Sequence, residues 1–174
     1  MIRSFFVSAV PTILLVTPVA ASAPTTEAPE EIAALRFLVG EWKGKGWIAF
    51  RPGKPEHFTS SEKVRSKLNG HILVIEGTHR DSRGKVVHEA LGVLSYDAAK
   101  RGLRFSSYLA NGRSGVYEAR HARGTLTWSL KTPGLTMRYK IRVDKRGRWN
   151  EVGEMSRDGK SWRRFFEMTL TRTR

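Results

Sequence analysis

Apolar and polar residues alternate with a period of two along most of this chain, from Glu41 onward. The alternation is clearest in residues 135–144, where leucine, methionine, tyrosine, isoleucine and valine form one face and the other face is mostly cationic. A period of two is typical of a β-strand that buries one face. The pattern predicts ten strands, near residues 41–50, 57–68, 71–80, 85–96, 102–110, 114–122, 124–131, 135–144, 148–156 and 161–172.

The predicted strands are joined by short segments rich in turn-forming residues, such as Asn69-Gly70 and Asp158-Gly159. Links of this length and chemistry form hairpins, so strands that are neighbours in sequence must pair antiparallel. A run of hairpins with no long crossover predicts an up-and-down meander, and such a meander removes its two edge strands by closing. We therefore predict an all-β fold, an up-and-down antiparallel barrel of eight to ten strands.

One segment before the strands has a helical period instead. Ile32, Leu35 and Leu38 recur at helical spacing in the sequence EEIAALRFL. Pro29 and the two glutamates that follow it suit a first helical turn, where a missing amide donor is harmless and negative charge is favoured. We expect one short N-terminal amphipathic helix that ends at Gly40.

The first residues have the order of a secretory signal peptide. Arg3 precedes an uncharged run over residues 5–19, and small residues follow the run. Pro11 and Pro18 interrupt the run, which is shorter than the roughly 20 apolar residues that span a bilayer. The segment therefore predicts export rather than a membrane anchor.

The export signal sets the domain boundaries. We place the signal peptide at residues 1–21, and cleavage after Ala23 also fits a small-x-small rule. Residues 22–29 are expected to form a flexible lead-in, and residues 30–174 a single β-barrel domain. The expected location is the periplasm or the extracellular space, with no transmembrane segment left after processing.

The composition is strongly basic and lacks cysteine. The 31 lysines and arginines against 16 acidic residues give a net charge of +15, or +14 without the signal peptide. Stability must come from packing, because no disulfide can form. Nucleic acid is not an expected partner of an exported chain. The expected partners are a small apolar or amphipathic molecule and, through basic rows such as Lys63, Arg65 and Lys67, an anionic envelope surface.

The sequence contains no convincing catalytic set. Its five histidines lack metal-ligand spacing, so no metal site is expected, and no Gly-x-Ser-x-Gly elbow occurs. Catalytic residues stay unassigned, and the balance is against an enzyme. Glutamates do occur inside predicted strands, where outward pairing with arginine or lysine is the expected placement and an inward carboxylate that orients a ligand is the alternative. They are Glu62, Glu76, Glu89, Glu118, Glu151, Glu154 and Glu167.

Aromatic residues indicate a function most directly, because they lie on different predicted strands and a closed barrel brings the inward ones together. The candidate ligand-binding residues are Trp47, Glu76, Tyr117, Trp128 and Tyr139. They favour an exported, non-catalytic barrel that binds a hydrophobic or amphipathic small molecule. Two alternatives stay open: a barrel hydrolase or isomerase that uses an internal carboxylate and a tyrosine, and a filled barrel whose cationic surface binds acidic envelope material.

The segment LRFLVGEWKGKG at the end of the predicted helix carries a family resemblance. Its Gly40-x-Trp42 element enters the first strand, followed by two glycines. This resembles the calycin opening shared by lipocalins and fatty-acid-binding-like barrels. The resemblance implies a calycin-like barrel in which Trp42 packs against an arginine of the last strand, and we choose Arg172.

The mature chain also resembles a bacterial exported family of unassigned function, through two further motifs, Leu68-Asn69-Gly70 and Gly92-x-x-x-Tyr96-Asp97. More distantly, it resembles the nitrobindin-like haem barrels. No histidine follows His121, so the late proximal haem ligand of that group has no counterpart here. No cofactor is therefore expected.

Overall fold

The structure is a computed structural model in which residues 27–51 and 53–174 are described. The predicted signal peptide, residues 1–21, lies outside the described residues, as does most of the predicted lead-in. Within the described ranges, no helix has both the length and the apolar character that crossing a membrane requires.

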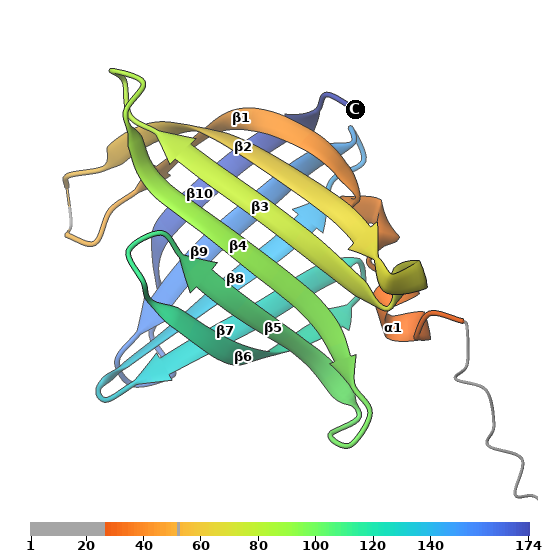
Figure 1. The fold of residues 1–174 in the computed structure, drawn as a ribbon. Helices are drawn as coiled ribbons and strands as arrows, with labels where there is room; N and C mark the ends of the chain where they lie inside the picture. Colours follow the sequence, from red (N-terminus) through yellow and green to blue (C-terminus); the bar gives the residue numbers. More distant parts are fainter. Residues whose placement is uncertain (1–26, 52) are drawn as a thin grey trace, which may run out of the picture.

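Ten antiparallel strands form one closed barrel (Figure 1). Each strand pairs with its neighbours in sequence, and β1 closes the barrel by pairing with β10. The predicted up-and-down meander is confirmed, with ten strands. They are β1 (Gly40–Ile48), β2 (Glu56–Lys67), β3 (Ile72–Arg80), β4 (Val86–Asp97), β5 (Gly102–Leu109), β6 (Ser114–Ala122), β7 (Thr125–Thr132), β8 (Leu135–Val143), β9 (Arg148–Ser156) and β10 (Arg163–Arg172), with a 3-10 turn η2 (Leu68–Gly70) between β2 and β3.

The N-terminal helical segment lies at one end of the barrel (Figure 1). It consists of α1 (Glu30–Ala33) and a 3-10 turn, η1 (Arg36–Leu38), so the predicted short N-terminal helix is confirmed, although it ends at Ala33 rather than at Gly40. The break falls at Leu35, whose φ of −96° and ψ of 4° lie outside the α-helical region. A helix this short has little stability of its own, so packing decides its path. Ile32, Leu35 and Leu38 are each at most 1% exposed.

Part of the hydrophobic core fills the same end of the barrel and forms its floor. Trp42 of β1 and Trp149 of β9 are fully buried, and their rings meet edge to face with centroids 5.6 Å apart. Each fully buried large apolar side chain contributes about 1.5–3 kcal/mol relative to an exposed one. Inward-facing leucines from other strands surround the two indoles, at Leu73, Leu94, Leu103, Leu126 and Leu170.

Arg172 in the last strand contacts residues at the start of the barrel domain, near Gly40 and Trp42. Arg172 Cζ lies 4.1 Å from the centroid of the Trp42 ring, a cation–π distance. The guanidinium also donates hydrogen bonds to the carbonyl oxygens of Phe37, at 2.7 Å, and Val39. Gly40 has a φ of +141°, and a Cβ at this position would lie 2.5 Å from Arg172 Nη1. Glycine therefore lets the arginine close over the tryptophan.

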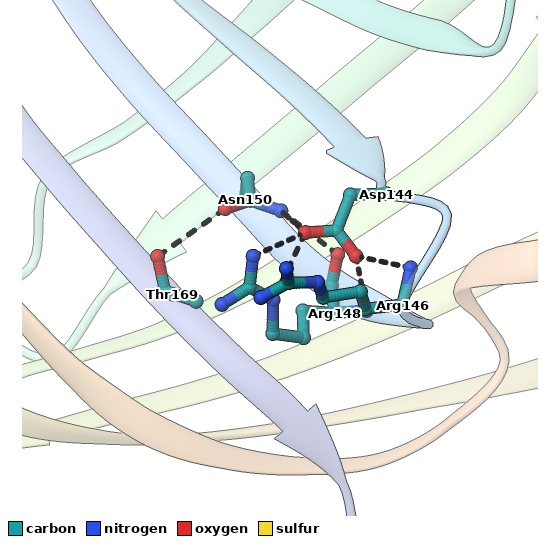
Figure 2. A network of polar contacts seen from close by, with 5 residues as sticks. All are labelled: Asp144, Arg146, Arg148, Asn150 and Thr169. Carbon is teal, nitrogen blue, oxygen red and sulfur yellow. Dashed lines mark hydrogen bonds and ion pairs between the residues drawn. The ribbon is translucent and has the colours of Figure 1, made fainter.

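One carboxylate holds the hairpin between β8 and β9 (Figure 2). Asp144 Oδ1 accepts hydrogen bonds from the backbone amides of Arg146, at 2.9 Å, and Arg148, at 3.0 Å. Asp144 Oδ2 pairs with the Arg148 guanidinium at 2.8 Å and accepts from Asn150 Nδ2 at 3.2 Å. Asn150 Oδ1 accepts from Thr169 Oγ1 on β10 at 3.3 Å. The turn is thus tied to two strands, and these contacts, led by the Arg148 amide, hold the pKa of Asp144 below its usual range.

Asp144→Ala should lower the midpoint of thermal unfolding by roughly 2–4 °C at neutral pH. The lowered pKa means that the carboxylate stabilises the fold above 3.8, its unfolded value, and that this contribution is lost as the pH falls further. Melting curves followed by circular dichroism at neutral and strongly acidic pH would measure this. Asp97→Ala, which removes a single backbone contact to Lys100, should have a smaller effect. Equal effects in the two variants would contradict a role for the extended network.

The barrel wall is incomplete between β6 and β7. Residues 119–122 of β6 pair with residues 125–128 of β7. Residues 114–118 of β6 and 129–132 of β7 have no partner across this junction. We call this junction the β6/β7 seam. Backbone groups along it are free to bind water or another molecule.

Candidate functional site

Three of the predicted ligand-binding residues come together on the inner face of the barrel. Tyr117 of β6, Trp128 of β7 and Tyr139 of β8 each share the inner face of their strand with buried core residues. The rings of Trp128 and Tyr139 stack with centroids 4.3 Å apart, and Tyr117 lies 5.3 Å from Trp128. Phe105 of β5 extends the group, 4.8 Å from Trp128. We call these four residues the aromatic wall.

The other two candidate ligand-binding residues, Trp47 and Glu76, lie outside this group, on the outer face of the barrel. Trp47 shares the outer face of β1 with two lysines, and Glu76 is exposed on the outer face of β3. The sequence did not reveal the position of Glu76, because β3 carries apolar residues on both faces and alternation alone does not show which face is buried. Leu73, with no exposed surface, shows that the other face of β3 is the inner one.

Two buried glutamates also lie inside the barrel, Glu62 of β2 and Glu151 of β9. Glu62 Oε1 accepts a hydrogen bond from Ser60 Oγ at 3.2 Å and lies 3.5 Å from His79 Nε2 on β3. Glu151 Oε2 accepts a hydrogen bond from Trp149 Nε1 at 3.3 Å. Among the described residues, no lysine or arginine forms an ion pair with either carboxyl. We call Glu62, His79 and Glu151 the acid–histidine cluster.

Burial determines the protonation of this cluster. Desolvation raises the pKa of Glu62 to about 8, although the Ser60 hydrogen bond acts in the opposite direction. Desolvation raises the pKa of Glu151 to about 8 as well, and the charge of nearby Glu62 adds to this effect. Desolvation lowers the pKa of His79 to about 4. All three groups are mostly uncharged at neutral pH, so the contact between Glu62 and His79 joins two neutral side chains rather than an ion pair.

Packed rings connect the cluster to the aromatic wall. The His79 ring stacks on Phe58 with centroids 4.2 Å apart and planes inclined by 5°. Phe58 lies 5.7 Å from Phe166, which lies 5.9 Å from Tyr139. Burial, followed by the charge of Glu151, raises the pKa of Tyr139 and so places this phenol near the second acid. The aromatic wall and the acid–histidine cluster therefore form one site.

Glycines make room for the site. A Cβ on Gly77 of β3 would lie 2.6 Å from Glu62 Oε2. A Cβ on Gly153 of β9 would lie 2.8 Å from Phe166 Cβ and 3.1 Å from a ring carbon of Tyr139. Glycine inside a strand commonly marks such a close approach. A glycine opposite a glutamate on the next predicted strand, as Gly77 lies opposite Glu62, is the sequence signal that could have identified the cluster.

The aromatic side of the interior is open to solvent. Tyr117, Trp128 and Tyr139 face inward yet keep partial exposure, whereas Phe58 and Phe166 on the opposite side are buried. The β6/β7 seam lies on the open side. Within the described part of the chain, Tyr117, but no other member of the aromatic wall, lines an open cleft of about 890 Å³ formed by β6, the start of β5 and α1. The partial exposure of its rings thus leaves the aromatic wall in contact with solvent.

The site can orient a ligand and exchange protons with it. A protonated carboxyl donates one hydrogen bond and accepts others, whereas an ionised carboxyl only accepts. In weakly polar surroundings such bonds are strong, and a polar group without a partner is costly. A concave surface that is mostly aromatic, with a few convergent polar groups, is typical of a small-molecule site.

Two solved structures have a similar fold. Rv2717c from M. tuberculosis superposes with a TM-score of 0.59 at 16% sequence identity, covering 85% of this chain and 100% of that chain. A protein with unknown function from the DUF3598 family of Nostoc punctiforme PCC 73102 superposes with a TM-score of 0.52 at 12% identity, covering 88% of this chain and 53% of that chain. At these identities the similarity shows the fold alone. A search of curated proteins finds no match.

The sequence of the barrel identifies its family. Residues 27–172 match the family described as "Protein of unknown function (DUF1579)". The match extends from just before α1 to the end of β10 and so includes both the aromatic wall and the acid–histidine cluster. The chain therefore belongs to the DUF1579 family.

Proposed function

We propose that this barrel binds a small, largely apolar molecule in its interior, holds the polar group of that molecule at the acid–histidine cluster, and does not convert it chemically. The observation that carries the proposal is the partly exposed aromatic wall beside two buried carboxyls in one interior. The rings supply apolar contact area, and the carboxyls supply orientation.

Features at the two ends of the chain support the same proposal. The arrangement of Gly40, Trp42 and Arg172 resembles the opening of calycin-like barrels, which are ligand carriers. The N-terminal signal sequence supports work in the periplasm or outside the cell. On the outer face of β2, the basic row that ends in Arg65 and Lys67 is exposed and can face an anionic envelope surface.

Trp128→Leu should weaken the binding of Nile red, a neutral apolar dye, by about tenfold. The change removes the central ring of the aromatic wall, and an aromatic pair contributes about 0.5–1.5 kcal/mol beyond its buried area. Dye fluorescence titrated with protein at fixed pH gives the dissociation constant. Trp47→Leu is the matched control, because Trp47 lies on the outer face, and it should bind the dye like the wild type.

Circular dichroism should show that both variants are folded at the temperature of the titration. A wild-type protein that binds no dye, and that carries no small molecule in native mass spectrometry when purified from its own host, would overturn the proposal. An equal loss in Trp128→Leu and Trp47→Leu would place the dye outside the barrel.

A second candidate function is a hydrolase or isomerase that uses Glu151 and Tyr139. It is favoured by one observation: burial and the charge of nearby Glu62 raise the pKa of Glu151 to about 8, near the pH at which a general acid or base must work. Such an enzyme would convert its bound molecule, and Glu151→Gln would abolish the conversion. Release of the co-purified molecule unchanged after long incubation supports the carrier instead.

A further inference from the structure

The barrel interior is acidic in a protein whose composition is strongly basic. The chain has 31 lysines and arginines against 16 acids, yet the described lysines of the strands lie on outer faces. The inward arginines are engaged at opposite ends of the barrel. Arg172 covers Trp42 at the floor, and Arg163 donates hydrogen bonds to the carbonyl oxygens of Ala49, at 3.1 Å, and Phe50, at 3.0 Å. The fold thus supplies no fixed cation to the two buried carboxyls.

Each buried carboxyl keeps one oxygen without a protein partner. The contacts from Ser60 and His79 go to Oε1 of Glu62, and the contact from Trp149 goes to Oε2 of Glu151. Within the described residues, the other oxygen of each carboxyl accepts no hydrogen bond. Neither of these two oxygens is fully enclosed by protein atoms. Both oxygens therefore keep a small solvent-accessible surface, although each glutamate is more than nine-tenths buried.

Aromatic rings pack around the acid–histidine cluster, where Phe58 and Phe166 stack on His79. Phe166 and Tyr139 pack between the acid–histidine cluster and the rest of the aromatic wall, and the Trp128 ring stacks on Tyr139. A ring face attracts a cation, and the attraction is stronger where water is excluded. An anionic ligand group would instead meet two carboxyls and no positive charge. Carboxyl oxygens and ring faces together select for positive charge.

We propose that the molecule held in this barrel is an organic cation, a protonated nitrogen base with a flat apolar body, whose nitrogen lies between Glu62 and Glu151. This rests on the proposed function, because it names the class of ligand for the same site. The bound cation favours the ionised form of the carboxyls, so binding releases protons from them to solvent. The ligand then supplies the positive charge that the fold leaves out.

The test compares two probes that differ at one position, 2-naphthylmethylammonium and the neutral 2-naphthylmethanol. Isothermal titration calorimetry at pH 7 should show that the ammonium binds at least tenfold more tightly. Its apparent heat should differ between phosphate and Tris buffers, because the released protons are taken up by the buffer, and the heat for the alcohol should not. The other titratable groups on neighbouring inner faces are His79, His88, Tyr117 and Tyr139.

Variants identify the groups responsible. Glu62→Gln combined with Glu151→Gln should bring the two affinities within about twofold of each other and leave the binding of the alcohol intact. Glu76→Gln, a change on the outer face, should keep the full preference for the ammonium. If the double variant does not fold, the single variants should each reduce the preference, and the buffer comparison on the wild type stands by itself.

Wild-type protein that binds the alcohol as tightly as the ammonium would overturn the assignment of a cation while leaving a ligand-binding barrel. Wild-type protein that binds neither probe nor Nile red would overturn the proposed function itself.

Discussion

Raising the pH from about 4.5 to about 8 should weaken the folded state, and replacing both buried glutamates should remove most of this effect. In the unfolded chain, Glu62 and Glu151 lose their protons near 4.5, whereas burial keeps them protonated in the fold until about 8. The folded state therefore binds more protons across this window, and each rise in pH favours unfolding. The contribution is complete below the unfolded pKa and lost above the folded one. One such group changes the unfolding free energy by about 1.4 kcal/mol per pH unit, so each of the two carboxyls accounts for a loss on the order of a few kcal/mol across this window.

His79 also changes how the stability depends on pH within this window. Desolvation lowers its pKa from 6.5 to about 4, so its contribution rises with pH below 6.5 and partly offsets the glutamates there. The decline in stability should accordingly be steepest above pH 6.5. Asp144 acts only below this window, because its pKa is lowered from 3.8.

Urea unfolding followed by far-UV circular dichroism at pH 5, 6.5 and 8 measures the effect as a change in unfolding free energy. The double variant with Glu62→Gln and Glu151→Gln should lose the decline between pH 6.5 and 8, because an amide does not titrate in this range. Between pH 5 and 6.5 it should keep the rise in stability that His79 contributes. Glu76→Gln on the outer face should keep the wild-type slope. A double variant that keeps the wild-type slope would show that the two carboxyls are not buried in their protonated form.

Trp42→Ala should destabilise the protein by about 3–5 kcal/mol, the range for removing a fully buried large side chain. Trp42 has no exposed surface, and its loss also removes the hydrogen bond from its Nε1 to the Leu38 carbonyl oxygen and the ring beneath Arg172. Trp47→Ala changes the same residue type on the same strand but on the outer face, and it should cost about 1 kcal/mol or less. Chemical denaturation of both variants measures the difference. Equal losses would contradict the assignment of inner and outer faces along β1.

The barrel could be predicted from sequence because hairpin chemistry is local. Turn residues such as Asn69 and Asp158 mark where each strand ends, and short links leave antiparallel pairing as the one solution. The same reasoning does not predict where the N-terminal helix ends. Ile32, Leu35 and Leu38 have the spacing of one helix, but contact with the barrel floor, and not helical propensity, decides how so short a segment is wound.

The site was less predictable, because inner and outer faces cannot be told apart in a strand that is apolar on both. Tyr139 belongs to a strand with one cationic face, so its inward direction followed from the pattern. Glu76 belongs to a strand without such a contrast, and it lies outside. Glu62 and Glu151 come from strands that are not neighbours, and only the closed barrel brings their charges within reach of each other.

The pairing of β1 with β10 determines when this chain can fold. Arg172 bonds to Val39, 133 residues earlier in the sequence. Such a contact forms late, because the chain must first lose the entropy of a long loop. While β10, only 10 residues long, is still absent from a growing chain, β1 and β9 each keep an open edge and the floor lacks Leu170. The last strand thus closes the barrel. A chain that stops before β10 leaves an open sheet that is prone to aggregate.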